Sequence, residues 1–185
     1  MDFNKKKQEI LRKEDQSNKG SIDNKIQKLC ETINQSPDFV TSSSCAGRIL
    51  LVKSFEKKNK QPKAWIWATH DLATKEEVSR VLKEYKGKEP LIFKQESAIL
   101  HIYCRSLEYA EQFIETARSS GFKRAGIITT KKHSIVEIIC LEQLAVPVFD
   151  KTILVQEKYL SYIIEEANKK LEKSWNCIKR LQETF

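Results

Sequence analysis

A run of small polar residues from Thr41 to Arg48, Thr-Ser-Ser-Ser-Cys-Ala-Gly-Arg, has the clearest chemical potential in this sequence. Small side chains let backbone amides approach a ligand closely, and consecutive amides in a turn can bind an anion. Ser43 and Ser44 add hydroxyl donors, and the guanidinium of Arg48 offers paired donors for a carboxylate or a phosphate. The alternative is a serine-rich turn whose arginine pairs with a surface acid, and composition alone favours that alternative.

The five cysteines predict neither disulfides nor a metal site. Their number is odd, they are widely spaced, and no Cys-x-x-Cys pair occurs, which argues against a disulfide framework and a zinc knuckle. Four of them have apolar neighbours and are expected to be buried thiols: Cys30, Cys104, Cys140 and Cys177. Cys45 differs because its neighbours are polar.

The charge balance is compatible with a nucleic-acid partner. Lys and Arg number 33 against 25 Asp and Glu, a net charge of +8, and phosphates attract such a surface without regard to sequence.

No apolar run approaches the ~20 residues that span a bilayer, and Met1 is followed by charged residues rather than a signal peptide. We therefore expect a soluble, cytoplasmic protein without membrane contact. Its length and 40% hydrophobic residues predict one domain over 1–185, with 1–20 flexible.

Hydrophobic periodicity predicts four helices and seven strands. The helices are expected at 21–34, with Ser21 as N-cap, and at 73–85, 106–121 and 156–183. The strands are expected at 48–55, 63–70, 90–95, 98–104, 124–130, 134–140 and 146–149, the first two joined by a turn at 56–63. Helices segregated from a mostly antiparallel or mixed sheet define the α+β class.

Two strand–helix–strand units look alike. In the first, the helix opens at Thr74, and in the second it opens at Ser106. The expected inward residues Val78, Val81, Leu82 and Tyr85 correspond to Ala110, Phe113, Ile114 and Ala117. This pattern indicates an internal duplication.

The long helix at 156–183 has an apolar stripe whose first half is expected to pack on the sheet, while its second half could form a homodimer contact.

The wider sequence resembles the tRNA wybutosine-synthesizing protein 3 family. The similarity runs through "SIDNKI", "SPDFVTSSSCAGRI", "WIWATHDL", "FKQESAILHIYCRSLEYA", "SSGFKRAGI", "VPV" and "EKYLSYIIEEANKKLEKSWNCIKRL", in the family's order, over about residues 3–183. The pattern Ser-Ser-Cys-small-Gly-Arg, followed by Trp…Thr-His-Asp and Lys-x-Glu…Leu-His, is specific to it. The resemblance implies an S-adenosylmethionine-dependent methyltransferase that modifies the N4 ring nitrogen of the wybutosine precursor at guanosine 37, in the anticodon region of tRNA(Phe).

Site residues follow from the resemblance as expectations. His70 and His101 are candidate bases, because a neutral imidazole can accept the proton that the acceptor nitrogen loses. The expected cofactor-binding residues are Ser43, Ser44, Cys45, Gly47, Arg48 and Glu96, and the expected RNA-binding residues are Trp65, Lys94 and Arg124. Arg48 could instead hold a tRNA phosphate, and Glu96 could simply pair with Lys94. Direct methyl transfer needs no thiolate, so Cys45 is not expected to be a nucleophile.

Three positions depart from the family pattern. Ile139 and Leu141 stand where an arginine and a threonine are frequent, and Ser97 stands where proline is usual. The first two remove a cation and a hydroxyl that could line the cofactor or RNA site. A non-catalytic tRNA-binding relative is therefore the alternative function, and a dimerisation module built on the last helix is a third.

Overall fold

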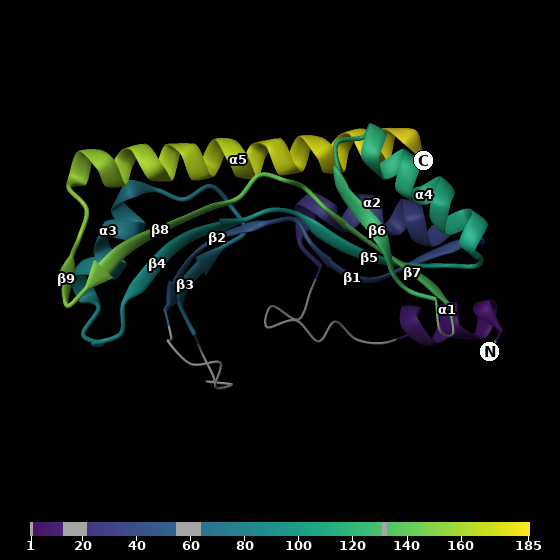
Figure 1. Ribbon diagram of the computed structural model, residues 1–185, viewed down its shortest axis with the longest axis horizontal. Helices are drawn as coiled ribbons and strands as arrows, with labels where there is room; N and C mark the ends of the chain where they lie inside the picture. Colours follow the sequence, from purple (N-terminus) through teal and green to yellow (C-terminus); the bar gives the residue numbers. More distant parts are fainter. Residues whose placement is uncertain (1, 13–21, 55–63, 131–132) are drawn as a thin grey trace. The chain divides into compact units, whose positions relative to one another are not determined.

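The structure is a computed structural model that describes residues 2–12, 22–54, 64–130 and 133–185 (Figure 1). Two compact units are present. Unit 1 comprises Met1–Ala46, Ser97–Leu141 and Ser174–Phe185, and unit 2 comprises Gly47–Glu96 and Glu142–Lys173. Each unit holds helices and one antiparallel sheet, so the α+β class is confirmed. The expected turn at 56–63, the N-cap Ser21 and much of the flexible segment 1–20 lie outside the described residues.

Unit 1 is a four-stranded sheet in the order β1-β5-β7-β6. Its strands are β1 (Phe39–Cys45), β5 (Ile99–Cys104), β7 (Ser134–Ile139) and β6 (Arg124–Thr129). Helices α2 (Asn24–Gln35) and α4 (Leu107–Ser119) lie on one face of this sheet (Figure 1). Asp23 is the N-cap of α2 and Ser106 the N-cap of α4, so the start of α2 lies after the predicted Ser21.

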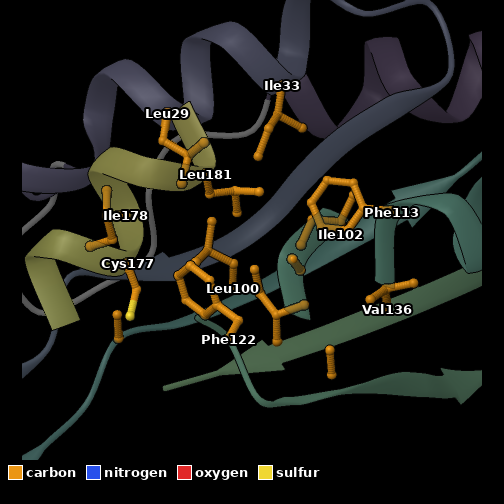
Figure 2. Close-up of a cluster of buried hydrophobic side chains, with 14 of the residues drawn as sticks. Leu29, Ile33, Leu100, Ile102, Phe113, Phe122, Val136, Cys177, Ile178 and Leu181 are labelled. Atoms are coloured by element: carbon orange, nitrogen blue, oxygen red, sulfur yellow. The ribbon is translucent and has the colours of Figure 1, made fainter. Parts of the chain in front are cut away.

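The core of unit 1 forms where the helices meet the covered face of the sheet. Figure 2 shows side chains from the helices pointing toward those of the strands, among them Leu29, Ile33, Leu100, Ile102, Phe113, Ile178 and Leu181. Strands β5 and β7 alternate between buried and half-buried residues, as expected when one face packs on α2 and α4 and the other is more open to solvent. Chemistry-bearing residues therefore gather on the second face.

Helix α1 (Phe3–Leu11) was not predicted, because charged residues outnumber apolar ones in it. Phe3 is buried and lies edge-on to His133. The ammonium of Lys7 donates to the carbonyl oxygens of Ser36 and Phe39. Arg105 donates to the side-chain oxygen of Asn4 and lies over the ring of Phe3. A few side-chain contacts thus hold a helix that has little amphipathic pattern.

Unit 2 is a five-stranded sheet in the order β3-β2-β4-β8-β9. Its strands are β2 (Arg48–Lys53), β3 (Trp65–Thr69), β4 (Leu91–Glu96), β8 (Leu144–Asp150) and β9 (Thr152–Ile153). Helix α3 (Lys75–Glu84) opens with a capping box between Thr74 and Glu77. The side-chain amide of Asn168 bonds the backbone of Ala73, which ties the start of α3 to helix α5 (Glu157–Thr184). The predicted long last helix is confirmed.

The two predicted strand–helix–strand units are present, one in each compact unit. Strands β3 and β4 both pair with β2, and strands β5 and β6 both pair with β7. In each case the two strands joined by a helix flank a third, antiparallel strand. The units differ in what lies beside this trio: β8 pairs with β4, whereas β1 pairs with β5.

Candidate functional site

The predicted loop at Thr41–Arg48 is mostly a strand. Residues Ser43, Ser44 and Cys45 belong to β1 and pair with β5, after a bulge between Thr41 and Ser43. As an edge strand, β1 can carry polar side chains on a surface open to solvent. The interpretation of this run as a turn of backbone amides is therefore wrong for these residues, because an extended strand points successive N–H groups in opposite directions and forms no amide turn.

Asp23 fixes the end of β1. This acid is buried, and its carboxylate accepts the backbone N–H of Ala46 at 3.0 Å. Gly47 follows with φ of 94°, a left-handed conformation that glycine adopts without strain. The carbonyl of Gly47 accepts Nδ1–H of His70 at 3.0 Å. The predicted base His70 thus carries its proton on Nδ1, and its ring is oriented by the backbone of unit 2.

His101 lies on the open face of the unit 1 sheet between two polar partners. Its Nε2 is 2.8 Å from a carboxylate oxygen of Glu137, and its Nδ1 is 3.2 Å from Oγ of Ser43. A carboxylate can only accept, so Nε2 carries the proton and the neutral Nδ1 accepts from the serine hydroxyl. Ser43, His101 and Glu137 are register partners across three strands, and we call them the His101 row. This row has the hydrogen-bond order of a base that is oriented by an acid.

Glu137 was missed by the sequence analysis. Its strand, Ser-Ile-Val-Glu-Ile-Ile, is otherwise apolar on both sides of the acid, and a lone carboxylate in such a strand is a usable signal. The partner, however, lies 36 positions away along the chain. Only the strand register brings the two side chains together.

Arg48 and Glu96 form an ion pair on the unit 2 sheet. They are register partners on β2 and β4, and both Nε and Nη2 of Arg48 lie 2.7 Å from Oε2 of Glu96. The ammonium of Lys94 is 3.3 Å from the other carboxylate oxygen. Burial by itself would raise the pKa of the Glu96 carboxyl, but the hydrogen bonds and charges of Arg48 and Lys94 together hold it below its ordinary value.

The guanidinium of Arg48 also lies over the ring of Trp65, 4.1 Å from its centroid. Trp65 is 39% exposed, and Trp67, two positions further along β3, is half-buried, so neither tryptophan is a core residue. An aromatic face, a cation and an anion therefore lie side by side in unit 2. The expected pair of Glu96 with Lys94 is present, and so are the neighbours that a charged ligand would need.

Arg124 lies on β6, in unit 1, and is the register partner of Ile139. A cation therefore remains in the row where Ile139 replaces the family's arginine. Leu141 is exposed, and the hydroxyl of Ser97 donates to the carbonyl of Cys140 at 2.6 Å. The serine that replaces proline thus has a structural partner of its own.

Four cysteines are buried and Cys45 is half-buried, which confirms the burial predicted from their neighbours. Among the described residues, no helix is long and apolar enough to cross a membrane.

Comparison with known proteins finds that residues 5–185 match the model of the family described as Methyltransferase TYW3. A relative from Homo sapiens, the "tRNA wybutosine-synthesizing protein 3 homolog", is 36% identical over 97% of this chain and 70% of its own length. A relative from Archaeoglobus fulgidus is 34% identical over 91% of this chain and 85% of its own. That protein is named "tRNA(Phe) 7-((3-amino-3-carboxypropyl)-4-demethylwyosine(37)-N(4))-methyltransferase".

Solved structures agree with the fold. A protein from Pyrococcus horikoshii superposes with a TM-score of 0.89 at 31% identity, covering 99% of this chain and 95% of the other. A hypothetical protein from Aeropyrum pernix gives a TM-score of 0.76 at 28% identity, over 88% of this chain and 96% of the other.

Proposed function

Because the chain belongs to the Methyltransferase TYW3 family, we propose that it methylates the N4 ring nitrogen of the wybutosine precursor at guanosine 37 of tRNA(Phe). The observation that carries this proposal is the similarity to the Archaeoglobus fulgidus enzyme, which extends over most of both chains. A methyltransferase needs a methyl donor, and a tRNA-modifying enzyme acts on tRNA. We propose further that the donor is S-adenosylmethionine, that the enzyme acts on the anticodon region of the tRNA, and that it does so in the cytoplasm.

The charges on the unit 2 sheet fit the methionine part of S-adenosylmethionine. That part carries an α-carboxylate and an α-ammonium on one carbon. The fork of Arg48 suits the carboxylate, and Glu96 suits the ammonium. Since these side chains already neutralise each other, a zwitterion can replace their mutual contact without leaving a charge unpaired. When bound, the cofactor supplies a methyl carbon on a positively charged sulfur.

The His101 row fits the proton that must leave the acceptor nitrogen. Replacing N–H by N–CH₃ releases one proton, and a base within hydrogen-bond reach accelerates that loss. Nδ1 of His101 can take the proton directly, or through the hydroxyl of Ser43, whose own proton then moves to the ring. Glu137 stabilises the imidazolium that results. Neither step requires a cysteine nucleophile or a metal ion.

Methylation of purified precursor tRNA(Phe), followed by mass analysis of nucleoside 37, tests the proposal. The parent chain should add one methyl group, and His101→Gln should lose most of that rate. His133→Gln is the matched control, because it removes a histidine of unit 1 that lies outside the row. Absence of both methyl transfer and calorimetric binding of S-adenosylmethionine would instead support the non-catalytic tRNA-binding relative. The predicted homodimer is tested separately by light scattering.

A further inference from the structure

A shallow pocket opens beside the His101 row on the uncovered face of the unit 1 sheet. Its volume is about 270 Å³, and its lining includes Arg124, Gly126, Ile128, Glu137 and Ile139. Pockets for drug-sized ligands usually measure ~300–1,000 Å³. This pocket is therefore suited to a single planar ring system rather than to a whole nucleotide.

Gly126 creates the space. It lies inside β6 as the register partner of Glu137, and a Cβ built at this position would meet no atom within 4 Å. A glycine inside a strand weakens the strand and often marks the close approach of a ligand. Ile128 and Ile139 supply apolar walls on either side, as a flat heterocycle needs.

The charged groups at the pocket suit a base that is part of an RNA chain. The carboxylate of Glu137 can accept hydrogen bonds from ring or exocyclic N–H groups. Arg124 is exposed, and its guanidinium makes no hydrogen bond or ion pair with any residue that the structure describes. This cation lines the apolar slot and is placed to meet a phosphate adjoining the bound base.

We propose that this pocket receives the fused-ring base of the substrate, over Gly126 and against Glu137. Gly126 pairs with Glu137, and Glu137 pairs with His101, so His101 lies two strands away from Gly126. Neighbouring strands are ~4.8 Å apart. A fused ring system laid across these strands extends from the pocket toward the His101 row. The inference rests on the proposed function, which supplies the base, and it gives Glu137 a second role as the wall that contacts it.

Filling the pocket tests the inference. The series Gly126→Ala, Gly126→Val and Gly126→Leu adds increasing bulk from a Cβ position that meets no atom within 4 Å, and circular dichroism of each variant checks that it folds. We expect kcat/KM for precursor tRNA to fall progressively, by at least ~100-fold in Gly126→Leu (about 2.7 kcal/mol). Gln112→Leu places the same leucine side chain at an exposed position of α4 and should behave like the parent. Binding of S-adenosylmethionine should be unchanged throughout.

A binding measurement keeps the test independent of catalysis. The parent should bind tRNA(Phe) carrying the precursor base more tightly than the same tRNA with unmodified guanosine 37, and Gly126→Leu should lose this discrimination. Equal discrimination and equal kcat/KM in parent and Gly126→Leu would overturn the inference. Selective loss of S-adenosylmethionine binding in Gly126→Leu would also overturn it, because the pocket would then hold part of the cofactor. A parent that discriminates but does not methylate would refute the proposed function alone.

Discussion

Nε2 of His101 lies 2.8 Å from Oε2 of Glu137, on neighbouring strands of one antiparallel sheet. This contact decides which ring nitrogen carries the proton. The other nitrogen is thereby an acceptor and faces the hydroxyl of Ser43. The strand register of unit 1 therefore selects a tautomer of His101 that can take up a proton at Nδ1.

Glu137→Gln should lower kcat for methyl transfer by roughly 10- to 100-fold, a part of what general-base catalysis contributes. The amide can accept or donate, so it no longer fixes the tautomer or stabilises the imidazolium. Nitrogen NMR of the His101 ring should show protonation at Nε2 in the parent and a mixture of tautomers in the variant. Unchanged kcat together with an unchanged tautomer would refute the positioning role.

Arg48→Lys should weaken binding of S-adenosylmethionine by about tenfold, or ~1.4 kcal/mol. Lysine keeps the charge, but it loses the two-nitrogen contact with Glu96 and the flat contact with Trp65. Titration calorimetry measures the change, with Arg80→Lys on α3 as the control. If Arg48→Lys binds both cofactor and tRNA like the parent, Arg48 does not hold an anion.

Glu96→Gln should reduce stability most at neutral pH. The folded-state pKa of Glu96 lies below its ordinary value of 4.5, so between the two values the unfolded chain binds more protons. The stabilisation from the ionised carboxyl is therefore complete above the unfolded-state pKa and is lost as pH falls through the folded-state pKa. Urea unfolding of parent and variant at several pH values should show their difference shrinking below pH 4.5. A difference that persists unchanged into acid would mean that the carboxyl acts through its shape alone.

Cys45→Ser should retain methyl transfer within about tenfold of the parent, under ~1.4 kcal/mol in barrier. Serine has nearly the same volume, and the displacement needs no thiolate. Cys45→Leu should abolish cofactor binding, because its larger side chain would crowd the end of β1. The domain should still fold, since Cys45 is only half-buried. Single-turnover rates measure both effects. A thousandfold loss in Cys45→Ser at unchanged cofactor affinity would show that the sulfur takes part in the reaction.

The elements with strong apolar periodicity could be predicted from the sequence. All four inward residues expected in α4 are buried, and so is the apolar stripe of α5, because local spacing indicates which face of a helix is apolar. In α3 only Val78 and Leu82 of the four expected residues are buried. The stripe of α5 comprises Leu160, Ile163, Ile164, Ala167, Leu171, Ile178 and Leu181. Strand β1 could not be predicted in the same way. Its serines lie on an edge strand, where one side is open to solvent and no alternation of apolar residues is required.

The candidate site shows the same division. Family motifs identified Ser43, His101 and Arg48, but Glu137 and the space over Gly126 depend on which strands pair and in which register. Pairing and register are long-range properties, and the local sequence of each strand does not show which strand it will pair with. Residue types alone therefore could not predict that Glu137 contacts His101 or that a pocket lies over Gly126.

The division of unit 1 into three segments has a consequence for synthesis on the ribosome. Met1–Ala46 emerges first, yet its partner strand β5 begins at Ile99, and β7, the strand that joins β5 to β6, comes later still. The segment Ser174–Phe185 contributes Ile178 and Leu181 to the same core. The hydrophobic face of α2 therefore has no partner from β5 while Gly47–Glu96 is translated, and it lacks Ile178 and Leu181 until Glu142–Lys173 has also been translated. Nascent chains stalled before Ser174 should bind hydrophobic chaperones through α2, even if the sheet of unit 2 has already formed.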